Sequence, residues 1–251
     1  MLETLLRPGK TFLLAAAMAV VPAIAHPSPP EEKDQIYIPK SFGAGKQEEV
    51  QHPELFYRAL GIPPSGPADS CGVKRVGIVG ASNTLGKSYV QYLQRLCPRT
   101  KFIVRAHGGY SPREQLHHLL PSLLKEKIEQ VIISPSGNAL DENDHVAAIT
   151  EMVEKIKQKG ISTTVLSVSP RPESYRTWSY FNDYLLQEKL GIPQLVDTTV
   201  DITTPLLKTD SSDICGYCQR DGVHWNDLGD QRVAVQIYNT LWAKEKLPLP
   251  E

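Results

Sequence analysis

Apolar residues alternate between two spacings along the chain from residue 73 onward. Short runs rich in β-branched residues predict five strands, at 73–79, 102–104, 131–133, 161–168 and 195–196. Apolar residues at helical spacing predict helices at 86–96, 113–125, 141–159, 175–190 and 226–244. Pro121 is expected to kink the second of these helices, and Gly160 to end the third. Strands that alternate with helices predict an α/β protein, with a mostly parallel five-stranded sheet between two helical layers.

The first 72 residues do not show this alternation. A basic start is followed by an apolar run at 12–21, and Ala23-Ile24-Ala25 has the small-x-small pattern that signal peptidases accept. The run is about half of the ~20 residues that span a bilayer, so a cleaved signal peptide at 1–25 is expected, with an uncleaved anchor as the alternative. We therefore expect an exported protein, periplasmic or secreted, with no stable membrane insertion after cleavage.

Two further segments follow the signal peptide. Residues 26–72 are rich in Pro, Gly and charge, which predicts an extended lead-in with one short helix at 53–60. Residues 73–251 carry the alternating pattern and are numerous enough for one domain with its own core. The formal net charge of -1 gives no electrostatic reason to expect a nucleic-acid partner.

An acid and an imidazole stand three residues apart, at Asp221 and His224, just before the last predicted helix. A histidine that is oriented by a carboxylate can activate a serine hydroxyl. Ser82 follows the first predicted strand, so it is the candidate nucleophile, with His224 as base and Asp221 as orienter. Each residue also has an ordinary structural interpretation, because Ser favours helix N-caps, Asp-Gly favours turns, and a histidine is often only hydrogen-bonded.

Polar or small residues follow each of the first three predicted strands. Ser82 follows the first, Gly108-Gly109 the second and Gly137-Asn138 the third. The carboxyl ends of parallel strands share one edge of the sheet, and such sheets bind ligands there. The backbone N–H groups of Ser82 and Gly109 and the side-chain amide of Asn138 are therefore candidate donors to a developing oxyanion.

Four blocks in this order resemble the SGNH, or GDSL-type, hydrolase superfamily over roughly residues 73–243. The blocks are Gly80-Ala81-Ser82-Asn83-Thr84-Leu85-Gly86, Gly108-Gly109-Tyr110-Ser111, Ser136-Gly137-Asn138 and Asp221-Gly222-Val223-His224. The sequence departs from the family pattern in two places. Ala81 stands where Asp is usual, and Ser136 and Ala139 flank the third block where Gly and Asp are commoner.

The resemblance implies a three-layer, flavodoxin-like α/β/α fold and ester hydrolysis through an acyl-enzyme, without a cofactor. It implies Ser82, His224 and Asp221 as the triad, and Ser82, Gly109 and Asn138 as the oxyanion hole. By family analogy the substrate is a small-molecule, carbohydrate or lipid-like ester. Acyl transfer to a sugar hydroxyl by the same triad is one alternative, and a non-catalytic binding or accessory module on the same fold is another.

A phosphate-binding loop is a competing interpretation of the first block. Residues 81–88 fit a relaxed form of that motif, with Ala81 in place of the first Gly and Lys87-Ser88 at its end. No predicted strand ends in the Asp that would help to hold magnesium, and an exported protein would meet little nucleoside triphosphate. Binding of nucleotide is therefore not expected.

The four cysteines are expected to form two disulfides, because an exported protein folds in an oxidising compartment. Cys71 precedes the first strand and Cys97 ends the helix that returns antiparallel to it, so these two can pair. Cys215 and Cys218 can close a small loop ahead of Asp221. A thiol–disulfide exchange motif is the alternative for this second pair.

Three histidines other than His224 invite a metal-site interpretation, but none is supported by spacing. His117 and His118 are adjacent on a predicted helix and point in different directions, and no Cys or carboxylate spacing completes a site with them or with His107. No metal is expected.

Overall fold

The structure is a computed structural model of the 251-residue chain. It describes residues 53–62, 71–85, 88–138, 141–169, 196–207 and 215–251, all of which belong to one compact unit, Gln35–Glu251. The predicted signal peptide, most of the lead-in and the predicted helix at 175–190 lie outside the described residues. None of the helices in the described ranges combines the length and the apolar character needed to cross a membrane.

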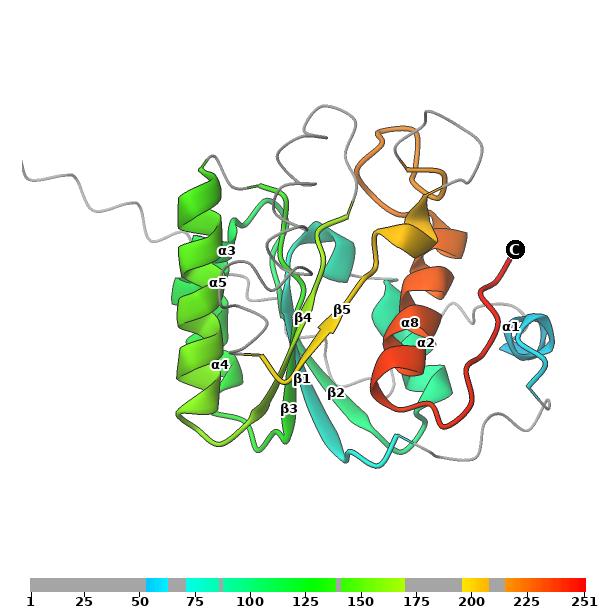
Figure 1. Cartoon of the computed structure of the whole chain (residues 1–251), viewed down its shortest axis with the longest axis horizontal. Helices are drawn as coiled ribbons and strands as arrows, with labels where there is room; N and C mark the ends of the chain where they lie inside the picture. Colours follow the sequence, from blue (N-terminus) through cyan, green and yellow to red (C-terminus); the bar gives the residue numbers. More distant parts are fainter. Residues whose placement is uncertain (1–52, 63–70, 86–87, 139–140, 170–195, 208–214) are drawn as a thin grey trace, which may run out of the picture. The chain divides into compact units, whose positions relative to one another are not determined.

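Five parallel strands form the sheet at the centre of the fold (Figure 1). Their bounds are β1 Arg75–Gly80, β2 Lys101–Ala106, β3 Gln130–Ile133, β4 Ser162–Leu166 and β5 Thr198–Val200. The strand order is β2-β1-β3-β4-β5, and every neighbouring pair is parallel. This pairing confirms the predicted parallel sheet, since parallel pairing requires a crossover between consecutive strands that returns the chain to the same edge.

The fifth strand lies beyond its predicted position. The sequence pattern placed it at 195–196, whereas β5 occupies Thr198–Val200 and Leu195 is outside the described residues. Two threonines interrupt the apolar pattern here, but their branched side chains favour extended backbone. Asp197 extends the pairing with β4: its N–H donates to the Thr163 carbonyl at 3.1 Å, and its carboxylate accepts from Thr163 N–H at 2.7 Å.

Helices cover both faces of the sheet (Figure 1). Helices α2 (Tyr89–Leu96) and α8 (Asp227–Leu241) pack on one face, and α5 (Glu142–Lys157) packs on the other. The alternation of side chains along β1 divides the core accordingly, because Val76 and Ile78 belong to one apolar cluster and Val79 to the other. The described part of the chain is thus a three-layer α/β/α sandwich.

Capping residues set where these helices begin. Ser88 caps α2 by accepting from the N–H of Val90, so the predicted helix at 86–96 is seen from Tyr89 onward. Asp141 caps α5, and Asn226 caps α8. The chain leaves α5 through Gly160 at φ +70°, a left-handed conformation that glycine adopts without strain.

Pro121 divides the helix predicted at 113–125 into three pieces. The pieces are α3 (Pro112–Glu114), a π-helical turn (Gln115–Leu119) and α4 (Leu120–Leu123). Proline has no N–H to donate four residues back, and its ring crowds that carbonyl, so the chain widens into a π turn just before it. The break therefore precedes the proline.

The first disulfide and the short helix α1 (Pro53–Ala59) both join the α2 side of the sheet. Cys71 and Cys97 are bonded, with 5.8 Å between their Cα atoms, which ties the approach to β1 to the end of α2 as expected. Phe56 of α1 packs against Tyr92 with ring centroids 5.0 Å apart. The described part of the lead-in is thus anchored on the domain.

Candidate active site

Ser82 stands at the carboxyl edge of the sheet, directly beyond β1. The strand ends at Gly80, and Ser82 opens a single 3₁₀ turn, Ser82–Thr84. A Cβ on Gly80 would collide with the side chain of Thr84, so only glycine allows the chain to turn this tightly. The turn lifts Ser82 out of the buried strand while the following helix α2 remains packed on the sheet.

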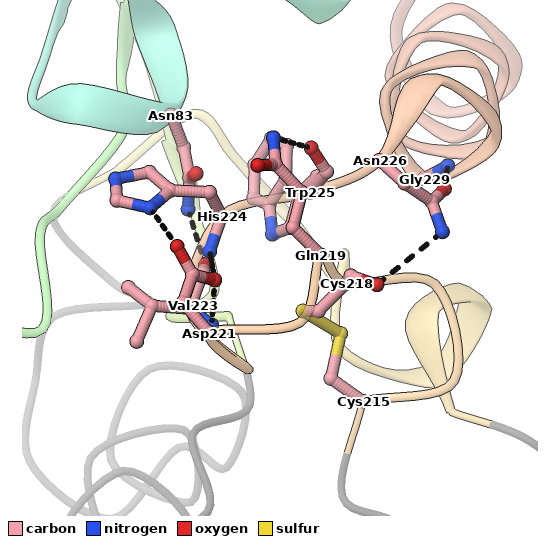
Figure 2. The surroundings of a disulfide bond; sticks show 10 residues. All are labelled: Asn83, Cys215, Cys218, Gln219, Asp221, Val223, His224, Trp225, Asn226 and Gly229. Carbon is pink, nitrogen blue, oxygen red and sulfur yellow. Dashed lines mark hydrogen bonds and ion pairs between the residues drawn. A yellow bond between two sulfur atoms is a disulfide. The ribbon is translucent and has the colours of Figure 1, made fainter.

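Asp221 and His224 form a hydrogen-bonded pair on the loop that leads into α8 (Figure 2). Asp221 Oδ2 lies 2.6 Å from His224 Nδ1. Its other oxygen accepts from the backbone N–H groups of Val223 at 2.9 Å and His224 at 3.0 Å. The hydrogen bond from His224, followed by these backbone donors, lowers the pKa of Asp221 to about 2. The carboxylate is therefore ionised at neutral pH and leaves Nε2 as the imidazole nitrogen available for proton transfer.

The second disulfide lies at the base of this loop (Figure 2). Cys215 is bonded to Cys218, and Cys218 forms an antiparallel bridge with Trp225. Gln219 N–H donates to the His224 carbonyl at 2.6 Å, and the Gln219 side chain donates to the Trp225 carbonyl at 3.0 Å. The disulfide and these bonds together hold a small hairpin whose tip presents Asp221 and His224.

One side-chain hydrogen bond joins the Ser82 turn to the loop that carries Asp221 and His224, here called the histidine loop. Asn83 Nδ2 donates to the carbonyl oxygen of Val223 at 3.2 Å (Figure 2). Ser82 and His224 line the same cavity, of about 230 Å³. Within the described residues no hydrogen bond joins Ser82 to His224, as is common in catalytic pairs before a substrate tightens them.

Two acidic residues from the first turn of α8 line the same cavity. Tyr92 Oη donates to Asp227 at 2.5 Å, and Tyr89 N–H donates to Asp230 at 3.0 Å. Asp230 is only 8% exposed, and burial raises its pKa to about 8, with the neighbouring Asp227 adding to the rise. The sequence pattern did not single out these carboxylates, because they also look like ordinary first-turn acids of a helix.

The other candidate oxyanion donors lie on the loops after β2 and β3. Gly109 has φ +82°, which requires glycine or strain. Gly137 and Ser136 line a second, smaller cavity together with Ser82. Gly109 and Asn138 are not among the residues that line either cavity. Ser136, which lines the smaller cavity, contacts both loops. Its hydroxyl donates to the carbonyl of Tyr110, the residue after Gly109, at 2.5 Å and accepts from the Asn138 N–H at 3.4 Å.

The contacts of Asn83 and Ser136 were not foreseen from the sequence. Both residues were visible within the four blocks, but their partners lie 140 and 26 residues away along the chain. In the sequence, Ser136 stands out only as a departure from the family pattern, and Ala81, a further departure, is buried at 6% exposure. Neither contact leaves a periodic signal in the sequence.

The residues behind the metal-site and phosphate-loop interpretations lie on different elements. No group of three or more His, Cys, Asp or Glu side chains that could hold a metal occurs in the described ranges. His117 and His118 are exposed on the π turn. Ser88 of the phosphate-loop pattern caps α2, while Gly86 and Lys87 lie outside the described residues.

No protein-family model and no curated protein matches this chain. Solved structures do match it. A GDSL-like lipase from Bacteroides thetaiotaomicron is 18% identical with TM-score 0.57, over 70% of this chain and 90% of that one. The lipase/acylhydrolase from Enterococcus faecalis is 16% identical with TM-score 0.57, over 71% and 99% of the two chains.

A third similar structure is the family 3 carbohydrate esterase from Clostridium thermocellum. It is 17% identical with TM-score 0.53, and the match covers 66% of this chain and 94% of that one. The TM-scores, all above 0.5, establish a shared fold, and at such low sequence identity they establish the fold alone. The chain therefore has the α/β/α fold of the SGNH and GDSL-type hydrolases, as its four sequence blocks predicted.

Proposed function

We propose that the protein is an exported serine esterase that hydrolyses carboxylic esters through an acyl-enzyme. The observation that carries this proposal is the position of His224, which lines one cavity with Ser82 while Asp221 holds its Nδ1 at 2.6 Å. An oriented imidazole beside a serine at the carboxyl edge of a parallel sheet is the arrangement that nucleophilic acyl transfer needs. The fold shared with lipases and esterases agrees with it.

Acylation begins when His224 Nε2 removes the proton from Ser82 Oγ, which then attacks the ester carbonyl carbon. Asp221 holds the Nδ1–H and stabilises the imidazolium that forms. The N–H groups of Ser82 and Gly109 and the Asn138 amide donate to the oxyanion of the tetrahedral intermediate. The intermediate collapses as His224 returns its proton to the departing alcohol, which leaves an ester on Ser82.

Deacylation repeats these steps with water in place of Ser82. His224 removes a proton from the water, the hydroxide attacks the acyl carbon, and the carboxylic acid departs as Ser82 regains its proton. If a sugar hydroxyl took the place of water, the product would be a new ester and the enzyme an acyltransferase. No metal or cofactor takes part in either route.

An acylated carbohydrate or another small ester is the proposed substrate class. The cavity of about 230 Å³ suits a small acyl group, and its lining includes the polar residues Asp227, Asp230, Ser88 and Gln219. Such polar groups favour a hydroxyl-rich leaving group over a long aliphatic one. The similarity to a carbohydrate esterase supports the same class.

The test is hydrolysis of p-nitrophenyl acetate and of a longer-chain homologue by wild type, Ser82→Ala and His224→Ala. We expect each variant to lose roughly three or more orders of magnitude in kcat, because the two residues act as a unit. Asp221→Asn should lose less, since it orients the imidazole and does not transfer the proton. Equal rates in wild type, Ser82→Ala and His224→Ala would rule out the assignment of these residues as a catalytic triad. Product analysis with added sugar acceptors separates hydrolysis from acyl transfer.

Export is tested separately from catalysis. The full chain, expressed in a secreting host, should appear outside the cytoplasm with a mature N-terminus near His26. A retained 1–25 segment in the exported fraction would instead indicate an uncleaved anchor.

A further inference from the structure

Ser136 is the point at which the loops after β2 and β3 meet. Its hydroxyl donates a short hydrogen bond, 2.5 Å, to the carbonyl oxygen of Tyr110, on the loop after β2. The same oxygen accepts a longer bond, 3.4 Å, from the backbone N–H of Asn138, on its own loop after β3. Ser136 is only 6% exposed. One buried hydroxyl therefore connects the two loops directly.

The two loops carry the two proposed oxyanion donors that do not come from Ser82. Gly109 immediately precedes Tyr110, and Asn138 is itself one of the partners of Ser136. Gly109 has φ +82°, and among the described residues beyond its two chain neighbours no atom lies within 4 Å of the place where a Cβ would stand. The bonds made by the neighbouring residue Tyr110 therefore bear directly on where Gly109 lies.

We propose that Ser136 is a positioning residue, which sets the spacing between the Gly109 N–H and the Asn138 amide so that both reach one oxyanion. This inference rests on the proposed esterase function. Oxyanion stabilisation requires donors held close to their productive geometry, and a displacement of one ångström can cost about a hundredfold in rate. A single hydroxyl bonded to both loops meets that requirement without touching the substrate.

Other contacts keep the loop after β2 folded when the Ser136 hydroxyl is removed. The rings of His107 and Tyr110 are stacked with centroids 3.9 Å apart. Ser111 forms a capping box with Glu114 at the start of α3. Ser136→Ala should therefore shift the donors and leave the domain folded.

The main experiment compares Ser136→Ala with a matched control, Ser122→Ala. Ser122 also donates its hydroxyl to a backbone carbonyl, that of Leu119 at 2.9 Å, but within the α4 region. Turnover is measured on p-nitrophenyl acetate per active site, counted by covalent labelling of Ser82 with an organophosphonate. We expect Ser136→Ala to lose roughly tenfold or more in kcat with KM changed less than about twofold, because the lost interaction acts in the transition state. Ser122→Ala should keep the wild-type kcat.

A double-mutant cycle with Asn138→Ala distinguishes positioning from a general structural role. If Ser136 acts through the oxyanion donors, its removal costs much less in the Asn138→Ala background than in wild type. Equal fold-losses in the two backgrounds would overturn the proposal. Ser136→Thr keeps the hydroxyl and should retain more kcat per labelled site than Ser136→Ala.

The outcomes also separate this inference from the function on which it rests. If Ser82→Ala is as active as wild type, the esterase proposal fails and the role of Ser136 fails with it. If Ser82 is essential but Ser136→Ala has the kcat of Ser122→Ala, only the positioning role is overturned.

Discussion

Asn83 holds the histidine loop from the nucleophile side: its side-chain amide donates to the carbonyl oxygen of Val223 at 3.2 Å. Asn83 is next to Ser82 in the chain, and Val223 is next to His224. The bond therefore links the immediate neighbours of the proposed nucleophile and the proposed base. The Asp221 carboxylate binds the N–H of the same Val223 at 2.9 Å. Val223 is thus held through its N–H by Asp221 and through its carbonyl by Asn83, and the loop cannot drift from Ser82 without breaking a bond.

Replacing Asn83 by Leu, which has a similar volume but no donor, should lower kcat by several-fold to about tenfold. The free energy of unfolding should fall by only about 1 kcal/mol, the usual net contribution of one hydrogen bond. The measurement is kcat on p-nitrophenyl acetate together with a thermal melt.

Asn239→Leu is the matched control for this variant. Its amide also donates to a backbone carbonyl, that of Leu247 at 2.8 Å, but on the C-terminal side of α8. We expect it to lower the melting temperature and leave kcat unchanged. If Asn83→Leu behaves in the same way, Asn83 contributes to folding alone.

The two disulfides should differ in what their removal affects. Replacing Cys71 and Cys97 by Ser opens a link with sequence separation 26, worth about 3–4 kcal/mol by chain entropy. Replacing Cys215 and Cys218 by Ser opens a link with separation 3, worth only about 2 kcal/mol, but frees the hairpin that carries Asp221 and His224. The first variant should lose mainly stability and the second mainly kcat.

Urea melts and steady-state kinetics of the two double-serine variants provide the comparison. Wild-type kcat in the Cys215→Ser/Cys218→Ser protein would show that the disulfide does not shape the loop that carries Asp221 and His224. An insulin-reduction assay on the wild type tests the remaining redox interpretation of this pair, for which we expect no activity.

Asp230 should make the folded state less stable as the pH rises. Burial raises its pKa from 3.8 to about 8, so between those values the folded state binds a proton that the unfolded state releases. Stability contributed by this protonated form is complete below pH 4 and is lost as the pH rises through 8. Asp230→Asn keeps an oxygen to accept from Tyr89 N–H and removes the titration.

The gain in melting temperature of Asp230→Asn over wild type should therefore be larger at pH 8.5 than at pH 5. Each kcal/mol gained corresponds to roughly 2–4 °C in a domain of this size. Asp227→Asn, at a less buried carboxylate in the same turn, is the comparison. An identical gain at both pH values would contradict a raised pKa at Asp230.

Gly229 permits the close approach to α8 of the loop that carries Asp221 and His224. A Cβ at this position would collide with the carbonyl oxygen of Tyr217, which also accepts from Asn226 N–H at 3.0 Å. Gly229→Ala should thus cost about 1–3 kcal/mol, although alanine normally stabilises a helix interior. Gly108→Ala is the control, because its Cβ would come no nearer than 3.7 Å to Leu85. A raised melting temperature for Gly229→Ala would contradict this prediction, because it would mean that the Tyr217 carbonyl moves away from the new Cβ at no cost in stability.

Most of the layered fold could be predicted from local patterns. Helical spacing located α5 and α8 to within a few residues, and Asp141, Asn226 and Gly160 define their ends by capping and backbone geometry. The patterns failed where polar or special residues interrupted them. Thr198 and Thr199 interrupt the apolar run, so the pattern did not place β5 correctly. Pro121 produced a π turn, which the spacing of apolar residues does not predict.

The sequence by itself determined the residue types of the candidate site and the edge on which they would meet. A serine after the first strand and an Asp-x-x-His before the last helix are local facts, and parallel strands bring their ends to one edge. Only the tertiary structure decided how these residues are held. The bonds from Asn83 to Val223 and from Ser136 to Tyr110 join residues distant in sequence, and their lengths depend on how the loops pack. Such contacts follow from the folded arrangement of the whole sheet edge, which no short stretch of sequence encodes.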